Sequence, residues 1–234
     1  MATLDWAVVR RELGDCMPWS PSWSRLTSYL LVSAGLLLWH GTASAELATG
    51  PYSSMRMCLE RTVLNVNVMS VRVRFDVPAQ RQIGALASGR QYSDSLAARI
   101  AQAAVHADEA QAVLGFQREV ELEAFLVSLS RGVREATKIG WISPATAAKL
   151  RGNLSDWFGP LRGRDFQEGE RLVFLGVGSR LTMTLVDRRG KRVTHRSAEF
   201  QNATTGMLAF FYVPGSGLRE PLIRSLFSRE PPDC

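Results

Sequence analysis

The stretch that decides the fold runs from Glu170 to His195 and reads ERLVFLGVGSRLTMTLVDRRGKRVTH. It divides into three strand-like segments, namely Glu170–Val177, Arg180–Asp187 and Lys191–His195. Gly178-Ser179 joins the first two and Arg188–Gly190 joins the last two, and connections this short are typical of hairpins. The stretch therefore predicts three neighbouring antiparallel strands.

The clearest helix of the chain lies upstream of these strands, from Glu121 to Ile139. Its apolar residues share one face, as expected of an amphipathic helix, and Gly140 provides a stop signal at its end. The apolar face holds Leu122, Phe125, Leu126, Leu129, Val133 and Ala136. The residues that lie away from that face are Glu121, Ser128, Arg131 and Glu135.

The valine-rich stretch from Met57 to Phe75 is strand-like, but the phase of its alternation slips by one residue at Met69-Ser70. A one-residue slip turns side chains to the other face of a sheet. Either a β-bulge or a tight bend between two strands is therefore expected there, with a strand over Leu64–Phe75. Asp76–Arg90 contains a proline and two glycines and is expected to be a loop.

The remaining elements complete an order in which helices are inserted into a mainly antiparallel sheet. They are a helix over Ser93–His106, a strand over Ala112–Gln117, a helix from Ser143-Pro144 to about Trp157, a helix from Ser197 or Ala198 through Phe211, and a last helix carrying Leu218, Leu222 and Leu226. Helices do not alternate with parallel strands. This order predicts an α+β fold in which one curved antiparallel sheet is covered on one face by helices.

The N-terminal segment has the three parts of a secretory signal. Arg25 precedes an apolar run, Leu26–Trp39, and Ala43-Ser44-Ala45 follows it. The run is shorter than the roughly 20 residues that a helix needs to span a bilayer. We expect residues 1–45 to be cleaved as a signal that starts at Met1 or Met17, and the mature chain to be periplasmic or secreted without a membrane span. A membrane anchor or a buried helix is the alternative interpretation.

The mature chain would comprise one domain, residues 46–228, and a polar tail, residues 229–234. Cys58 and Cys234 are its two cysteines, and an oxidising compartment would allow them to pair. The 234-residue chain is 46% hydrophobic and carries a net charge of +6. Its arginines are scattered among acidic and apolar residues, which favours a solvated surface over a nucleic-acid partner.

Motifs for catalysis or metal binding are not evident in the sequence. His106 and His195 have no second histidine or cysteine at ligand spacing, so neither a metal nor a cofactor is expected. Gly176-Val177-Gly178 lacks the rest of a dinucleotide fingerprint, and no G-x-S-x-G motif is found. Aromatic and methionine residues are frequent, and a sheet with one helical layer can leave an apolar slot that suits a hydrophobic ligand.

Three segments carry a resemblance to a known family. They are Phe116–Val120 (FQREV), Phe166–Phe174 (FQEGERLVF) and Glu199–Ala203 (EFQNA). They resemble the F-x-R-x-V, F-x-x-G-D-x-L and D-x-x-F-x-x-A segments of chalcone isomerase-like proteins, and the similarity extends over roughly Met55–Phe227. The resemblance implies an open-faced β-sandwich with a ligand cleft between the sheet and the helices.

The resemblance also implies which residues form the site. Members of the family cyclise chalcones, bind fatty acids or have no known activity. Of the isomerase residues only an arginine on an early strand has a counterpart, Arg56, whereas the threonine position falls on Val68 and the tyrosine and asparagine positions fall near Val120 and Val127. Loss of the tyrosine removes the group that positions the nucleophile, which favours a protein without catalytic activity.

Arg56 is therefore expected to bind the carboxylate of a fatty acid or another amphipathic molecule, with Arg118 as the second candidate. The Met207–Tyr212 helix is expected to cover the apolar tail of this ligand, with Tyr212 as a third ligand-binding residue. Two alternatives remain open at the level of sequence. One is an isomerase-type enzyme with a rebuilt site, and the other is a structural or partner-binding module whose cleft is filled by side chains.

Overall fold

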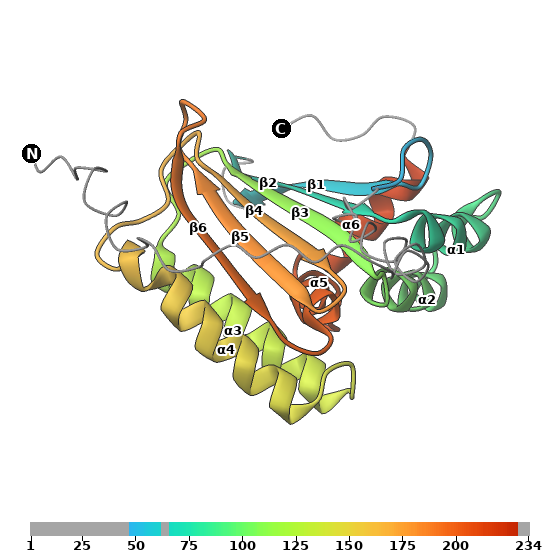
Figure 1. Cartoon of the computed structure of the whole chain (residues 1–234). Helices are drawn as coiled ribbons and strands as arrows, with labels where there is room; N and C mark the ends of the chain where they lie inside the picture. The colour runs from blue at the N-terminus through green and yellow to red at the C-terminus, as the bar shows by residue number, and fades with distance from the viewer. Residues whose placement is uncertain (1–46, 62–65, 229–234) are drawn as a thin grey trace, which may run out of the picture. The chain divides into compact units, whose positions relative to one another are not determined.

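The computed structural model describes residues 47–61 and 66–228. Within them six strands form one antiparallel sheet whose spatial order follows the chain (Figure 1). The strands are β1 (Ser54–Arg61), β2 (Val66–Phe75), β3 (Glu109–Phe116), β4 (Arg171–Val177), β5 (Arg180–Val186) and β6 (Arg192–Glu199). The predicted signal and the polar tail, with Cys234, lie outside the described residues, so the pairing of Cys58 with Cys234 stays a prediction.

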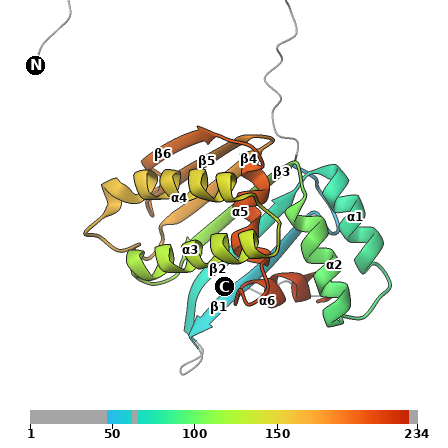
Figure 2. The same ribbon diagram turned by 90° about the horizontal axis from the view of Figure 1, so that it is seen from below.

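Six α-helices belong to the same described part of the chain. They are α1 (Val77–Ala87), α2 (Asp94–Val105), α3 (Leu122–Lys138), α4 (Pro144–Phe158), α5 (Ala203–Tyr212) and α6 (Arg219–Arg224). The view from below shows α3, α4, α5 and α6 on one side of the sheet (Figure 2). The predicted α+β fold, an open curved antiparallel sheet with helices over one face, is confirmed.

Alternation along the strands sends one set of side chains toward the helices. In β3 the buried residues are Ala110, Ala112, Leu114 and Phe116, and the residues between them are partly exposed. The neighbouring strands place Val71, Val73, Phe174 and Met183 in the same buried layer. Because side chains alternate along a strand, Arg56 of β1 and Arg72 and Arg74 of β2, which lie next to buried residues, are on the opposite face of the sheet.

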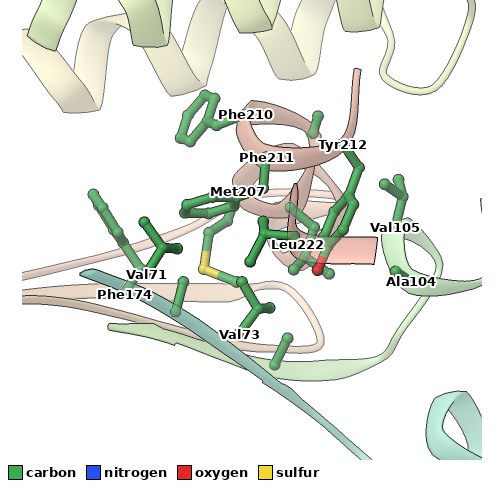
Figure 3. Close-up of a cluster of buried hydrophobic side chains, with 14 of the residues drawn as sticks. Val71, Val73, Ala104, Val105, Phe174, Met207, Phe210, Phe211, Tyr212 and Leu222 are labelled. Carbon is green, nitrogen blue, oxygen red and sulfur yellow. The ribbon is translucent and has the colours of Figure 1, made fainter. Parts of the chain in front are cut away.

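α5 forms the centre of the helical layer. Every residue in it except Thr205 is buried, and a helix that is apolar all round is expected to be covered on every side. It contacts α2, α3 and α4 as well as strands β3, β4 and β5. Met207 and Phe211 pack with Val71 and Val73 of the sheet (Figure 3).

The helices predicted around residues 93–158 are confirmed. Ser93 and Ser143 cap α2 and α4, since their hydroxyls accept from the backbone N–H of Leu96 (3.3 Å) and Thr146 (3.0 Å). Pro144 occupies the first turn of α4, where the missing N–H costs no hydrogen bond. Among the described residues, no helix combines the length and apolar character that a bilayer crossing requires.

The valine-rich stretch differs from its prediction in one respect. It forms two strands rather than one, since β1 ends at Arg61 and β2 begins at Val66. The two strands pair antiparallel. The predicted phase slip is a β-bulge. Leu59 pairs with Met69 and Glu60 pairs with Asn67, which leaves Val68 as the extra residue, one position before the predicted slip. A tight bend at Met69-Ser70 was the wrong alternative.

The loop predicted over Asp76–Arg90 is wrong, because Val77–Ala87 forms α1. The Asp76 carboxylate accepts from the Ala79 N–H at 2.8 Å and caps the helix, and Pro78 falls in the first turn, where proline is tolerated. The second Asp76 carboxylate oxygen accepts from the Glu109 N–H at 2.8 Å, which ties the start of α1 to β3.

The start of the helix predicted at Ser197 or Ala198 is also wrong. β6 continues to Glu199, and α5 begins at Ala203. Pairing with β5 explains the longer strand, since Thr182 lies opposite Ser197 and Arg180 forms an ion pair with Glu199 at 2.6 Å. Asn202 then adopts a left-handed conformation that turns the chain into α5.

Candidate functional site

A cavity of about 350 Å³ lies between the sheet and the helical layer, beside α3. Its walls come from β1, β2, β3, β4, α3, the end of α5 and the loop that follows α5. Apolar side chains dominate the lining, among them Met69, Leu114, Phe125, Leu129, Phe174 and Phe210. This cavity corresponds to the apolar slot that the layered arrangement predicts. Its size falls in the range of about 300–1,000 Å³ that is typical of small-molecule sites.

The wall between α3 and α5 depends on a close helix contact. A Cβ atom built on Gly132 of α3 would lie 3.2 Å from the Cα of Phe210, so a larger residue would require the two helices to separate by a few tenths of an ångström. The ring of Phe210 lines the cavity, and the apolar face of α3 supplies Phe125 and Leu129. α3 is thus held close to α5 at one point, and the cavity lies alongside that contact.

The loop after α5 forms another wall and is fixed by Ser216. The Ser216 hydroxyl donates to the Phe210 carbonyl at 3.2 Å and accepts from the Leu218 N–H at 3.3 Å. Pro214 and Gly215 end the helix, and Gly215 has a φ of +79°, a conformation that glycine adopts without strain. The turn therefore presents a defined surface to the cavity, next to α3.

Three polar residues of α3 lie where the cavity meets solvent. Ser128, Arg131 and Glu135 line it at helical spacings of three and four residues, which places them along one edge of the helix. Glu135 forms an ion pair with Lys138 at 2.7 Å. Arg131 is exposed, and its side chain has no hydrogen bond or ion pair to any residue that the structure describes. The mouth of an apolar cavity thus carries one guanidinium without a carboxylate partner in this part of the chain.

The structure places Arg56 outside the lining of this cavity. Its neighbours in β1, Met55 and Met57, are buried under the helical layer, so Arg56 lies on the other face of the sheet, opposite Arg72 of β2. Its backbone N–H donates to the Ser225 hydroxyl at 3.0 Å. A role for Arg56 in ligand binding stays a prediction.

Arg118 and Tyr212 are also absent from the lining. Arg118 follows β3 and is exposed. Tyr212 is fully buried, and its hydroxyl donates to the Met55 sulfur at 3.2 Å. Figure 3 shows its ring leaving α5 toward Val105, on the other side from Phe210. Burial raises the pKa of the Tyr212 phenol well above its ordinary value. The structure does not bring Arg56, Arg118 and Tyr212 together, and their binding roles remain untested.

Sequence reasoning did not identify the polar residues at the mouth of the cavity. Ser128, Arg131 and Glu135 were correctly separated from the apolar face of the helix, but that separation is also found on any solvated helix face. What distinguishes this edge of α3 from a solvated helix face is its proximity to Pro214-Gly215. That proximity arises from tertiary packing and cannot be recognised in the sequence. A second, polar depression lies around Glu119, Glu121, Glu123 and Asp165.

Metal binding and activated nucleophiles have no evident support in the described residues. They contain no group of three or more His, Cys, Asp or Glu residues that could hold a metal ion. Within the described lining of the cavity, neither Ser128 nor Ser216 has a histidine or carboxylate as a hydrogen-bond partner, and such a partner is what activates a serine hydroxyl.

Comparison with known proteins adds little to this geometry. No family model matches the sequence, and no curated protein matches it. Among solved structures, the chain is similar to a fatty-acid binding protein from Arabidopsis thaliana, with a TM-score of 0.46 and 11% sequence identity. The match covers 75% of this chain and 87% of the plant protein. A similarity this weak carries no argument about function.

Proposed function

We propose that the protein binds an amphipathic small molecule of the fatty-acid class in the cavity beside α3, without chemically transforming it. The observation that carries this proposal is the combination of an apolar cavity of about 350 Å³ with the guanidinium of Arg131 at its mouth. An acyl chain needs apolar walls, and its carboxylate needs a cation or hydrogen-bond donors at the solvent end.

Burial of the ligand's acyl chain would supply most of the binding affinity. Each buried methylene contributes about 0.8 kcal/mol, so an acyl chain of about ten carbons gains about 8 kcal/mol toward offsetting the cost of association. Phe174 of the sheet and Phe125 and Phe210 of the helices offer the surfaces against which the chain would pack.

Arg131 would determine which end of the ligand faces solvent. A guanidinium can hold a carboxylate through two parallel charge-assisted hydrogen bonds. Because Arg131 is exposed, water and salt weaken this attraction, and its contribution is expected to lie near that of a surface ion pair, about 1 kcal/mol or less. Ser128, one turn earlier on the same helix edge, is placed to add a hydrogen bond.

Two variants of α3 test the proposal by titration of a fluorescent fatty acid. Ser128→Trp places a large side chain at the mouth and should weaken binding by about tenfold or more. Val127→Trp is the matched control, because Val127 is 56% exposed and does not line the cavity. Equal affinity in the wild type and Ser128→Trp, or absence of binding by the wild type, would contradict the proposal.

A further inference from the structure

On the face of the sheet away from the helices, three arginines occupy adjacent positions. Arg56 of β1 lies directly opposite Arg72 of β2, and Arg74 follows two residues later on the same face of β2. Directly opposed residues have Cβ atoms about 5 Å apart, and residues two apart along a strand are about 7 Å apart. The three guanidinium groups, on long flexible stems, can therefore reach a common point.

This arrangement concentrates positive charge without local compensation. Neither the ion pairs nor the side-chain hydrogen bonds found among the described residues connect any of the three to a carboxylate. In the described part of the chain, the Arg74 side chain donates only to the Ala48 carbonyl, at 3.5 Å. Like charges directly opposite each other destabilise a strand pair. The sheet thus carries an unfavourable pairing that a bound anion would relieve.

The surroundings of the arginines are suited to an anion. Ser54 of β1 and Gln111 of β3 lie on either side of Arg74 in the same row of the sheet, and both can donate hydrogen bonds. Val113 of β3 lies beside Arg72, so the residue that faces Arg72 from β3 carries no charge. Glu109 is the carboxylate of β3 on this face, two residues beyond Gln111, and it makes no ion pair with the cluster in the described part of the chain.

The electrostatic consequence is visible at the central arginine. Desolvation, followed by the positive charges of Arg56 and Arg74, lowers the pKa of the Arg72 guanidinium. Among the described residues, no acidic group acts on the pKa of Arg72 in the opposite direction. Arg72 is nevertheless exposed, so a ligand can reach it from solvent.

We propose that Arg56, Arg72 and Arg74 form a binding site for a phosphate group on the open face of the sheet. A dianionic phosphate carries more negative charge and more acceptor oxygens than a carboxylate, which suits it better to three adjacent guanidinium groups. The site is separate from the apolar cavity, because the sheet lies between them. It does not depend on the proposed fatty-acid binding.

Titration of inorganic phosphate into the full chain at low ionic strength tests the site. The wild type should bind phosphate saturably, and Arg72→Gln should weaken binding by about tenfold or more, since it removes the central charge and keeps a polar side chain. Arg171→Gln is the matched control. Arg171 is an exposed arginine on the same face, in β4, and it lies opposite Gly115 and Val186 rather than another arginine.

Vesicles distinguish the two sources of a phosphate group. Binding to phosphatidylcholine vesicles that contain phosphatidic acid, lost in Arg72→Gln and absent with pure phosphatidylcholine, would assign the site to a lipid headgroup. Saturable binding of inorganic phosphate without vesicle binding would assign it to a soluble phosphate. Absence of both, or an equal loss in Arg72→Gln and Arg171→Gln, would overturn the proposal. Fatty-acid binding should be unchanged in Arg72→Gln, which separates this test from that of the cavity.

Discussion

Gly132 of α3 lies so close to Phe210 of α5 that a Cβ atom at Gly132 would stand 3.2 Å from the Phe210 Cα. The contact is with backbone, so it can be relieved only by moving a helix. α5 is packed between the sheet and three other helices and has little freedom to move. α3 would therefore have to move outward, and α3 forms one wall of the cavity.

A pair of glycine substitutions tests this packing. Gly152 lies in α4, and a methyl group added there would have nothing within 4 Å, so Gly152→Ala should stabilise the protein by about 0.5–1 kcal/mol through helix propensity. Gly132→Ala has the same propensity gain but must separate two helices, and we expect no net gain or a loss of about 1 kcal/mol. Urea unfolding of both variants measures the difference. Equal stabilisation would show that α3 and α5 are not in close contact at Gly132.

The aromatic cluster beside the cavity predicts two different losses of stability. Phe166 is buried, and its ring stacks on Phe116 with centroids 4.2 Å apart, so Phe166→Ala should cost about 3–5 kcal/mol. Phe125 contacts the rings of Phe116, Phe158 and Phe166 but is only partly buried. Phe125→Ala should cost less, about 2 kcal/mol. A Phe125→Ala loss equal to or above that of Phe166→Ala, measured by denaturant unfolding, would contradict the packing order.

The buried phenol of Tyr212 is expected to make the folded protein less stable at alkaline pH. Burial raises the pKa of its phenol in the folded protein, whereas the unfolded chain has the ordinary value near 10. Its contribution is therefore fully present below about pH 10 and declines as pH rises toward the folded pKa. Tyr212→Phe removes the ionisable phenol. When the pH is raised from about 9.5 to 11, the variant should therefore lose less folding stability than the wild type. Identical pH profiles of thermal unfolding would show that the phenol ionises freely.

Arg131 predicts a preference for ligands with a free carboxylate. The wild type should bind a fatty acid several-fold more tightly than its methyl ester, because the ester cannot accept two charge-assisted hydrogen bonds from a guanidinium. In Arg131→Ala the two ligands should bind equally. Arg134→Ala is the control, since Arg134 is exposed on the same helix and does not line the cavity. If Arg131→Ala retains the preference, Arg131 does not orient the ligand, and Arg56→Ala and Arg118→Ala become the next variants to measure.

Export remains a prediction from residues 26–45 and has its own test. Cleavage after Ala45 would give an exported protein whose N-terminal sequence begins at Glu46. Edman sequencing of the protein from the periplasmic or extracellular fraction measures this directly. A full-length chain that begins at Met1 or Met17 and is confined to the cytosol would contradict it.

Local patterns were sufficient to predict most of the fold. The period of 3.6 through Glu121–Ile139 and the short turns between Glu170 and His195 depend only on neighbouring residues, and the structure has a helix and antiparallel strands there. α1 was missed because Pro78, Gly84 and Gly89 were interpreted as loop signals. Proline is compatible with a first helical turn, and Asp76 supplies the cap.

The candidate site was less predictable because it depends on packing between distant segments. Arg131 and Arg134 are indistinguishable in sequence as polar residues of one amphipathic helix. Only the position of the Pro214–Leu218 loop beside α3 makes Arg131 part of a cavity mouth. In the same way, Arg56, Arg72 and Arg74 are ordinary strand arginines until the register of β1 against β2 places two of them opposite each other.

The most direct test of the proposed function is a crystal structure of the protein soaked with a fatty acid that carries bromine at the end of its chain. We predict an anomalous bromine peak inside the cavity, close to Phe174 and Phe210, with the carboxylate near Arg131. A bromine peak elsewhere, or an empty cavity at a ligand concentration that saturates binding in solution, would contradict the proposed function.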